Sequence, residues 1–155
     1  MGDNSMKLEI PAQGPNVALA RLAVAAFAAG LDFTLPEIEE IKVAVSEAVT
    51  NVVLHAYGAA GGTITITAAI DAGRLLVTVA DAGRGIADVK RARQPGQSTC
   101  PGRTGLGFSF MESLMDEVAV DAAPGRGTTV RMVKRPAPGT GAPPDTAPGS
   151  GVPPG

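Results

Sequence analysis

A long amphipathic helix, expected over Leu35–Tyr57, constrains the fold of this chain more than any other feature. Its start is marked by Thr34-Leu35-Pro36-Glu37, where Thr is a preferred N-cap, Pro suits the first turn and Glu completes a capping box. At about 100° per residue, one side of the helix carries the apolar residues Ile38, Ile41, Val45, Ala48, Val49 and Val52. A helix with one apolar side must pack against another layer, so we expect at least two layers.

Segments rich in Ile, Val and Thr between Gly, Pro and Asp residues indicate that the second layer is a sheet. The expected strands are Met6–Ile10, Thr63–Ile70, Arg74–Ala80, about Val118–Asp121, and Thr128–Val133, with a turn at Asp71-Ala72-Gly73. Two further helices are expected at Asn16–Ala29, where Leu19, Leu22, Ala26 and Phe27 recur near helical spacing before Gly30, and at Gly105–Met115. The pattern predicts an α+β domain of two layers with a mostly antiparallel sheet.

The composition supports one folded domain followed by a tail. Hydrophobic residues make up 45% of the 155 residues and charged ones 18%, which is enough apolar material for a core. From Pro136 to Gly155, seven of twenty residues are Pro and five are Gly. We therefore expect a domain over residues 1–135 and a disordered tail over residues 136–155, either passive or carrying a Pro-rich docking motif.

Charge and cysteine content exclude some classes of protein. A net charge of −2 and a pI near 5.3 argue against a non-specific nucleic-acid binder. The single cysteine, Cys100, cannot form an internal disulfide, which favours a reducing, cytoplasmic setting. We expect no export signal and no membrane span, since the apolar stretch Val17–Gly30 is interrupted by Arg21 and is shorter than the roughly 20 residues needed.

The polar side of the long helix contains a candidate catalytic pair. Glu47 and Asn51 are four residues apart, away from the apolar stripe, and His55 continues their row. A carboxylate and an amide oxygen one turn apart suit a hydrated Mg²⁺ and a polarised hydroxyl. A solvated helix face is the alternative interpretation.

Two glycine-rich loops add candidate ligand contacts. Asp81-Ala82-Gly83-Arg84-Gly85 directly follows a strand, and its Asp could accept a hydrogen bond from an exocyclic amine such as that of adenine. Gly102-Arg103-Thr104-Gly105-Leu106-Gly107 opens a helix, whose free amides form an anion site. This second loop matches neither a Walker A nor a Rossmann motif. An ordinary Asp-Gly turn and a plain N-cap are the alternatives.

The order of these motifs resembles the GHKL (Bergerat) ATP-binding fold of DNA gyrase, the Hsp90 chaperones, sensor histidine kinases and MutL. In that family a Glu/Asn helix is the N box, an Asp-Gly loop holds adenine, and the segment before the second Gly-x-Gly is the ATP lid. The resemblance implies an α/β sandwich in which three helices cover one face of a mixed, mainly antiparallel sheet.

Within that superfamily the chain most resembles the anti-sigma factor serine kinases, and among them the anti-sigma F factors of sporulating bacteria. The likeness spans about residues 6 to 135. It is carried by Ile41-Lys42-Val43-Ala44-Val45-Ser46-Glu47-Ala48-Val49-Thr50-Asn51, His55-Ala56-Tyr57, Ala92-Arg93-Gln94-Pro95, Gly105-Leu106-Gly107-Phe108, Phe110-Met111-Glu112-Ser113-Leu114-Met115-Asp116-Glu117-Val118, and Gly127-Thr128-Thr129-Val130.

The resemblance implies Mg²⁺- and ATP-dependent phosphorylation of a serine on a small anti-anti-sigma protein, together with sequestration of a sigma factor. It assigns polarisation of the serine hydroxyl to Glu47, Mg²⁺ to Asn51, and partner binding to Arg21. ATP or ADP would be bound by Asn51, Asp81, Gly83, Gly85, Arg103, Thr104, Gly105, Gly107 and Thr128. A homodimer is also implied, with no direct contact to nucleic acid or membrane.

The chain departs from the family at the lid, which is about two residues shorter between Pro95 and Gly105 and has Gly102 where an acidic residue is expected. This departure concerns how the lid contacts the partner and the γ-phosphate, although Arg103 remains. The alternatives are a nucleotide-gated module that holds a sigma factor without kinase activity, against which the intact Glu47 and Asn51 argue, and an anti-sigma kinase of the general stress response type. A sensor histidine kinase is disfavoured because the phospho-accepting helix is absent. A gyrase-like ATPase is disfavoured because 155 residues leave no room for the large second domain that such an ATPase needs.

Overall fold

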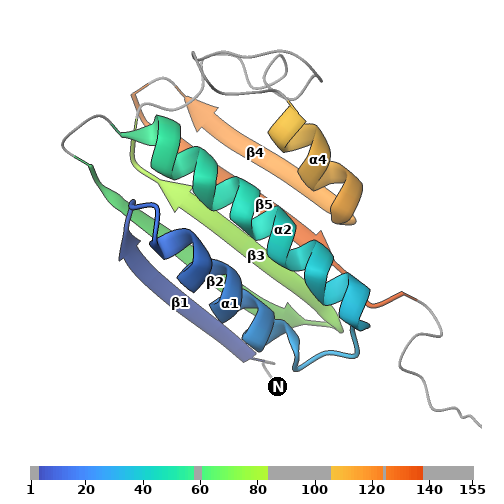
Figure 1. Ribbon diagram of the computed structural model, residues 1–155. Coiled ribbons are helices and arrows are strands. Elements are labelled where there is room, and N and C mark those ends of the chain that lie inside the picture. The colour runs from blue at the N-terminus through green and yellow to red at the C-terminus, as the bar shows by residue number, and fades with distance from the viewer. Residues whose placement is uncertain (1–3, 58–60, 84–105, 124, 138–155) are drawn as a thin grey trace, which may run out of the picture.

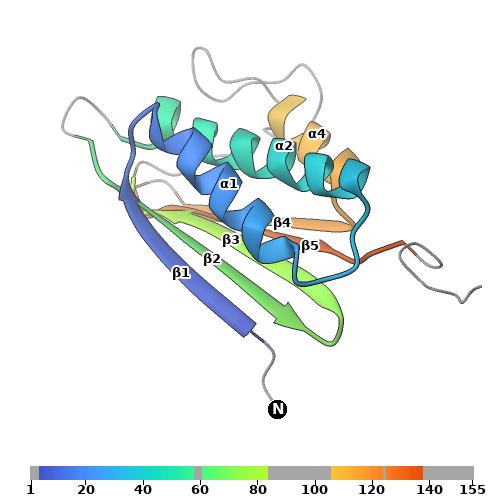
Figure 2. The ribbon, with the colours of Figure 1, turned by 60° about the horizontal axis from the view of Figure 1, so that its bottom comes forward.

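The computed structural model describes residues 4–57, 61–83, 106–123 and 125–137. In these ranges the chain forms a five-stranded sheet with three helices on one face (Figures 1 and 2). The elements are β1 (Asn4–Pro11), α1 (Asn16–Ala28), α2 (Leu35–Asn51), the π-helical turn η1 (Val52–Ala56), β2 (Thr63–Asp71), β3 (Arg74–Asp81), α4 (Leu106–Leu114), β4 (Glu117–Ala123) and β5 (Gly127–Lys134). The expected two-layer α+β fold is confirmed.

The strand order is β1-β2-β3-β5-β4, and every pairing between the described strands is antiparallel. The β2–β3 hairpin turns at Ala72 and Gly73, both with positive φ, which matches the right-handed twist of the strands. Strand β5 lies between β3 and β4. Because β3 and β5 are antiparallel neighbours, the end of β3 lies beside the start of β5, and Asp81 pairs with Thr128. This pairing joins residues far apart in the sequence.

The start of α2 is as the sequence predicts. The Thr34 side chain accepts a hydrogen bond from the Glu37 N–H, and the Glu37 side chain accepts one from the Thr34 N–H, so the capping box is complete. The predicted apolar stripe faces the sheet, and of its members only Ile38 is half-buried instead of buried. The stripe packs against the inner residues of the strands, which include Ile64, Ile66, Leu75, Val77, Val79, Val130 and Met132.

Helix α1 turns a different side to the core than the leucine spacing suggested. Ala20, Val24 and Ala28 are buried, whereas Leu19 and Leu22 are 47% and 55% exposed. Small residues one turn apart let α1 approach α2 closely, so the alanines take the interior positions. The two leucines therefore lie on the outer surface of the helical layer.

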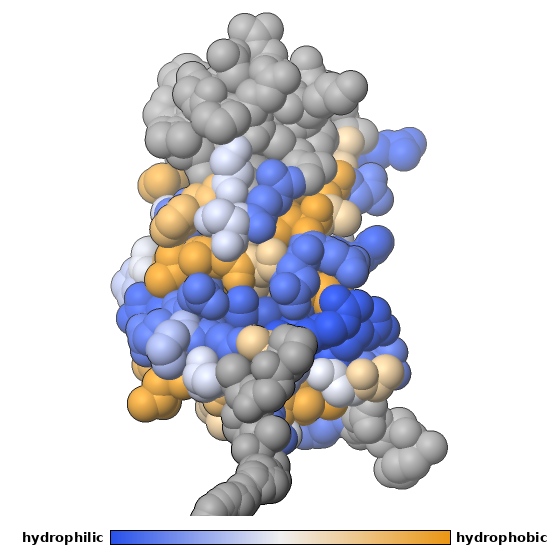
Figure 3. All heavy atoms as spheres, turned by 90° about the vertical axis from the view of Figure 1, so that its right-hand side faces the viewer, coloured by the Kyte–Doolittle hydropathy of each residue, from blue (hydrophilic) through white to orange (hydrophobic). Residues whose placement is uncertain are grey.

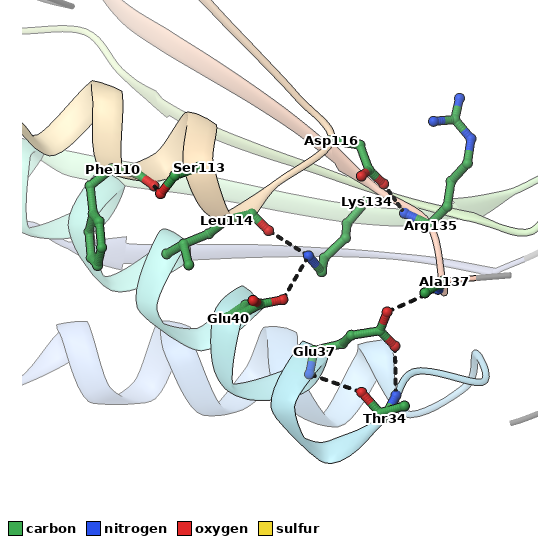
Figure 4. Close-up of polar contacts among 10 residues, drawn as sticks. All are labelled: Thr34, Glu37, Glu40, Phe110, Ser113, Leu114, Asp116, Lys134, Arg135 and Ala137. Atoms are coloured by element: carbon green, nitrogen blue, oxygen red, sulfur yellow. Dashed lines mark hydrogen bonds and ion pairs between the residues drawn. The ribbon is translucent and has the colours of Figure 1, made fainter. Parts of the chain in front are cut away.

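The end of the sheet where β5 stops is joined to the helical layer by polar contacts (Figure 4). The buried Lys134 donates to the Leu114 carbonyl and pairs with Glu40 at 3.1 Å. Beyond it, the N–H of Ala137 donates to the Glu37 carboxylate at 2.9 Å. Figure 3 shows hydrophilic residues forming a broad band across this side of the molecule. The capping Glu37 thus also holds the chain after β5.

Replacing Glu37 by Gln is expected to lower stability slightly at neutral pH and to have no effect in acid. Partial burial works to raise the pKa of the Glu37 carboxyl, but hydrogen bonds from Thr34 and Ala137, with Lys134 nearby, lower it below its ordinary value of 4.5. A carboxyl whose pKa is lowered by folding stabilises the fold at pH values above its pKa in the unfolded chain. This stabilisation is lost as the pH falls through the pKa that the carboxyl has in the folded protein. The effect is small because the carboxylate is largely solvated.

The measurement is the urea midpoint of the wild type and Glu37→Gln at about pH 7 and about pH 3. Gln resembles the protonated side chain, so the two midpoints should converge at the lower pH. A difference that persists or grows in acid would contradict the role given to the ionised carboxylate.

Within the described residues, none of the helices combines the length and the apolar character needed to cross a bilayer. Most of the expected tail, residues 138–155, lies outside the described residues, as does residue range 84–105, which contains the expected lid.

Candidate functional site

The candidate catalytic pair lies near the C-terminal end of α2. Glu47 and Asn51 are one turn apart, both are half-buried, and Asn51 is the last residue of the helix. Figure 1 shows that this end of α2, the end of β3 and the first turn of α4 point toward the same end of the molecule. A carboxylate and an amide from one rigid helix therefore stand at the end where the chain also contributes its Asp-Gly turn.

The helix changes type directly after Asn51, and this alters the position of His55. Val52–Ala56 form a π-helical turn, and His55 is only 8% exposed. A π turn closes hydrogen bonds between residues i and i+5, so the i, i+4 row of an α-helix does not continue through it. The prediction that His55 continues the polar row of Glu47 and Asn51 was therefore wrong.

The turn after β3 is fixed by its own aspartate. One carboxylate oxygen of Asp81 accepts a hydrogen bond from the Gly83 N–H at 2.9 Å, which is an Asx turn. Gly83 is packed against the end of η1, since a Cβ at this position would lie 1.9 Å from the carbonyl oxygen of Ala56. Only glycine fits between the turn and the helix end.

The start of β5 packs against the backbone of Asp81. Gly127 has φ +89°, and a Cβ there would lie 2.1 Å from the Asp81 carbonyl oxygen. The next residue, Thr128, is half-buried and pairs with Asp81 across the sheet. The structure thus brings Asp81, Gly83 and Thr128 together, at the end of the sheet toward which the C-terminal end of α2 points.

The other predicted ligand residues are not tested by the structure. Gly85, Arg103, Thr104 and Gly105 lie outside the described residues, and Gly107 is in the first turn of α4. Arg21 is half-buried on α1, between the exposed Leu19 and Leu22 in sequence. Its Nε atom is buried, and Arg21 lies on α1, whereas the turn that contains Asp81 follows β3.

The donor groups at this end suit a magnesium ion held mainly by a nucleotide. Among the described residues, no group of three or more His, Cys, Asp or Glu side chains could hold a metal. Mg²⁺ commonly takes only one or two protein oxygens and completes its shell with phosphate oxygens and water. The side-chain oxygen of Asn51, at the end of α2, fits that requirement as a single protein ligand.

A hollow of about 650 Å³ lies beside the same turn, lined by Glu9, Tyr57, Gly62, Thr63, Thr65, Ala80, Asp81 and Ala82. Along β2, Thr63 and Thr65 alternate with the buried Ile64 and Ile66, so this hollow opens on the side of the sheet without helices. Of the predicted ligand residues, Asp81 alone contributes to it.

Sequence reasoning gave no role to Tyr57 or Gly62, although both contact this region. The Tyr57 hydroxyl bridges two backbone groups near the turn, and Gly62 packs against the ring. A usable signal was present: the only tyrosine of the chain directly follows the long helix and precedes the pair Gly61-Gly62.

Comparison with known proteins identifies the family of this chain. A family model for the histidine kinase-like ATPase domain matches residues 10–134. The solved structure of full-length ShkA in complex with AMPPNP shares the fold, with a TM-score of 0.52 and 23% identity over 80% of this chain and 30% of that one. The chain therefore belongs to the histidine kinase-like ATPase domain family.

Curated relatives define the subgroup. The anti-sigma F factor of Pasteuria penetrans is 48% identical over 139 residues, covering 87% of this chain and 93% of the relative. The anti-sigma F factor of Bacillus subtilis (strain 168) is 43% identical over 134 residues, covering 84% of this chain and 92% of the relative. Within the ATPase family, the chain belongs to the anti-sigma F factors.

Proposed function

We propose that this protein binds and inhibits a sporulation sigma factor and uses Mg-ATP to phosphorylate a serine on its anti-anti-sigma antagonist. The observation that carries the proposal is the match to anti-sigma F factors at 43–48% identity over more than four fifths of the chain. The location of Glu47 and Asn51 one turn apart on α2 supports the proposal.

The nucleotide would bind between the end of α2 and the two glycine turns. Asp81 would accept a hydrogen bond from the adenine amine, because an ionised carboxylate is an acceptor and the Gly83 N–H holds this carboxylate in the turn. Thr128, paired with Asp81, would fix the base through water. Gly83 and Gly85 would shape the adenine loop, and the phosphates would be held by Arg103, Thr104, Gly105 and Gly107.

Glu47 would act on the serine substrate. Its carboxylate would accept the proton of the serine hydroxyl as that oxygen forms a bond to the γ-phosphorus and ADP leaves. Asn51 would hold Mg²⁺, which supplies charge neutralisation at the phosphates when it is bound. Both side chains project from one helix whose apolar side is buried in the core, which keeps their separation constant.

The outer surface of α1 is the proposed partner site. Arg21 is half-buried on this helix and Leu19 and Leu22 are exposed; exposed apolar side chains and arginine are typical of protein interfaces. We also propose a homodimer, a domain over residues 1–135 with a separate tail over 136–155, and a cytoplasmic location. The partner site and the homodimer extend the resemblance to anti-sigma F factors, whereas the tail rests on the Pro and Gly content after Pro136 and the location on the single cysteine.

Calorimetry and a transfer assay test the proposal. ADP and ATP should each bind the protein with Mg²⁺ present, and incubation with Mg-ATP and a candidate anti-anti-sigma protein should produce phosphoserine. Nucleotide binding without transfer would leave only a nucleotide-gated sigma-binding module. No heat with either nucleotide at millimolar Mg²⁺ would overturn the nucleotide site itself.

A further inference from the structure

Tyr57, the residue after η1, links three segments that meet near the Asp81 turn. Its hydroxyl donates a hydrogen bond to the Thr63 carbonyl at 2.7 Å, at the start of β2. The same oxygen accepts a hydrogen bond from the Ala82 N–H at 2.9 Å. The hydroxyl therefore uses its donor and one of its acceptor positions on backbone groups that are far apart in the sequence.

The packing around Tyr57 is close enough to set the position of the ring. A Cβ on Gly62 would lie 2.3 Å from ring carbons of Tyr57, so this position admits only glycine while the ring stays in place. The preceding residue, Ala56, presents its carbonyl to Gly83 at a distance that also excludes a Cβ. The end of η1 is thus held against β2 on one side and against the turn after β3 on the other.

The contact to Ala82 falls on the residue between Asp81 and Gly83. The Gly83 N–H is bonded to the Asp81 carboxylate, and the Ala82 N–H is bonded to Tyr57, so two successive amides of the turn point at side-chain oxygens. The first contact ties the carboxylate to its own turn, and the second ties the turn to the end of the helix. Together the two hydrogen bonds restrict the turn in the absence of a ligand.

We propose that Tyr57 is a positioning residue for the purine base: its hydroxyl holds the Asp81–Gly83 turn so that the Asp81 carboxylate meets the adenine amine. The role rests on the proposed nucleotide site and acts through Asp81. Guanine carries a carbonyl where adenine carries this amine, so a correctly placed carboxylate favours adenine and repels guanine. Tyr57 therefore contributes to the choice of base more than to binding of the phosphates.

The experiment compares ADP and GDP binding to the full chain by calorimetry with Mg²⁺, in the wild type and in Tyr57→Phe. Phe keeps the ring against Gly62 and removes both hydrogen bonds of the hydroxyl. We expect ADP affinity to fall about three- to tenfold, the range of one net hydrogen bond, with GDP affinity unchanged. The preference for adenine should shrink by the same factor.

Two further variants separate positioning from a general loss of stability. Thr34→Ala removes the N-cap at the opposite end of α2 and should destabilise the fold without changing the ratio of ADP to GDP affinity. Gly62→Ala keeps the hydroxyl and displaces the ring, and it should reduce the adenine preference as Tyr57→Phe does.

The outcomes are distinguishable. If the wild type prefers ADP and Tyr57→Phe keeps that preference in full, the positioning role is overturned and the nucleotide site stands. An equal loss of ADP and GDP affinity in Tyr57→Phe also overturns it, because that is the result of a purely structural role. If the wild type binds neither nucleotide, the proposed function fails and the role of Tyr57 fails with it.

Discussion

Glu47→Gln is expected to lower the rate of serine phosphorylation by about 10²- to 10⁴-fold while ADP affinity stays close to that of the wild type. Gln has nearly the same shape but cannot accept the proton of the serine hydroxyl. The side chain of Glu47 forms no hydrogen bond or ion pair with other residues in the described part of the chain, so the substitution breaks no side-chain contact there. The loss should therefore appear in the chemical step.

The measurement is a single-turnover transfer assay with Mg-ATP and the anti-anti-sigma protein, with ADP binding measured in parallel. Glu39→Gln is the matched control, because it removes a negative charge from the exposed side of the same helix, where Glu39 pairs with Lys42. The control should transfer phosphate at the wild-type rate. A Glu47→Gln protein that retains more than about a tenth of that rate would show that another group accepts the proton.

Gly127→Ala should be the most destabilising small substitution at the candidate site, with a loss of about 2–5 kcal/mol. A left-handed backbone costs a non-glycine residue about 1–2 kcal/mol, and Gly127 has φ +89°. Overpacking adds about 1–3 kcal/mol, because the new Cβ would lie 2.1 Å from the Asp81 carbonyl oxygen. Since backbone occupies that space, the β3–β5 pairing at Asp81 has to shift.

Gly125→Ala provides the matched control in the same loop. Gly125 has a similar φ of +75°, but a Cβ there would meet nothing within 4 Å. Its substitution should therefore cost only the backbone part, about 1–2 kcal/mol. The comparison uses urea unfolding of both variants. Equal losses would mean that the contact with Asp81 contributes nothing and that backbone strain accounts for the whole effect.

Much of the fold could be predicted because its signals are local. The capping box at Thr34 needs only four consecutive residues, and the β2–β3 hairpin needs only a short polar turn between two apolar segments. The apolar stripe of α2 follows from helical periodicity alone. The candidate pair Glu47 and Asn51 was predictable for the same reason, since residues one turn apart share a helix face.

The sequence-based predictions failed where burial is decided by packing against other elements. Spacing placed Leu19 and Leu22 near the apolar positions of α1, yet close approach to α2 favours the smaller Ala20 and Val24 in the interior. His55 is carried into the core because the helix changes from α to π at Val52, and no pattern of residue types marked that change. The burial of these α1 residues and of His55 depends on which other elements of the fold pack against them.

The sequence by itself determined the elements of this protein, their approximate ends, the polar face of α2 and membership of the ATPase family, because these depend on neighbours within a few residues or on shared motifs. Only the tertiary structure decided what surrounds Asp81. Gly83 meets Ala56, Gly127 meets the Asp81 carbonyl, and Tyr57 bonds to Ala82. These contacts join residues that meet only when β5 enters beside β3 and η1 reaches the turn, so steric fit in the folded chain sets them.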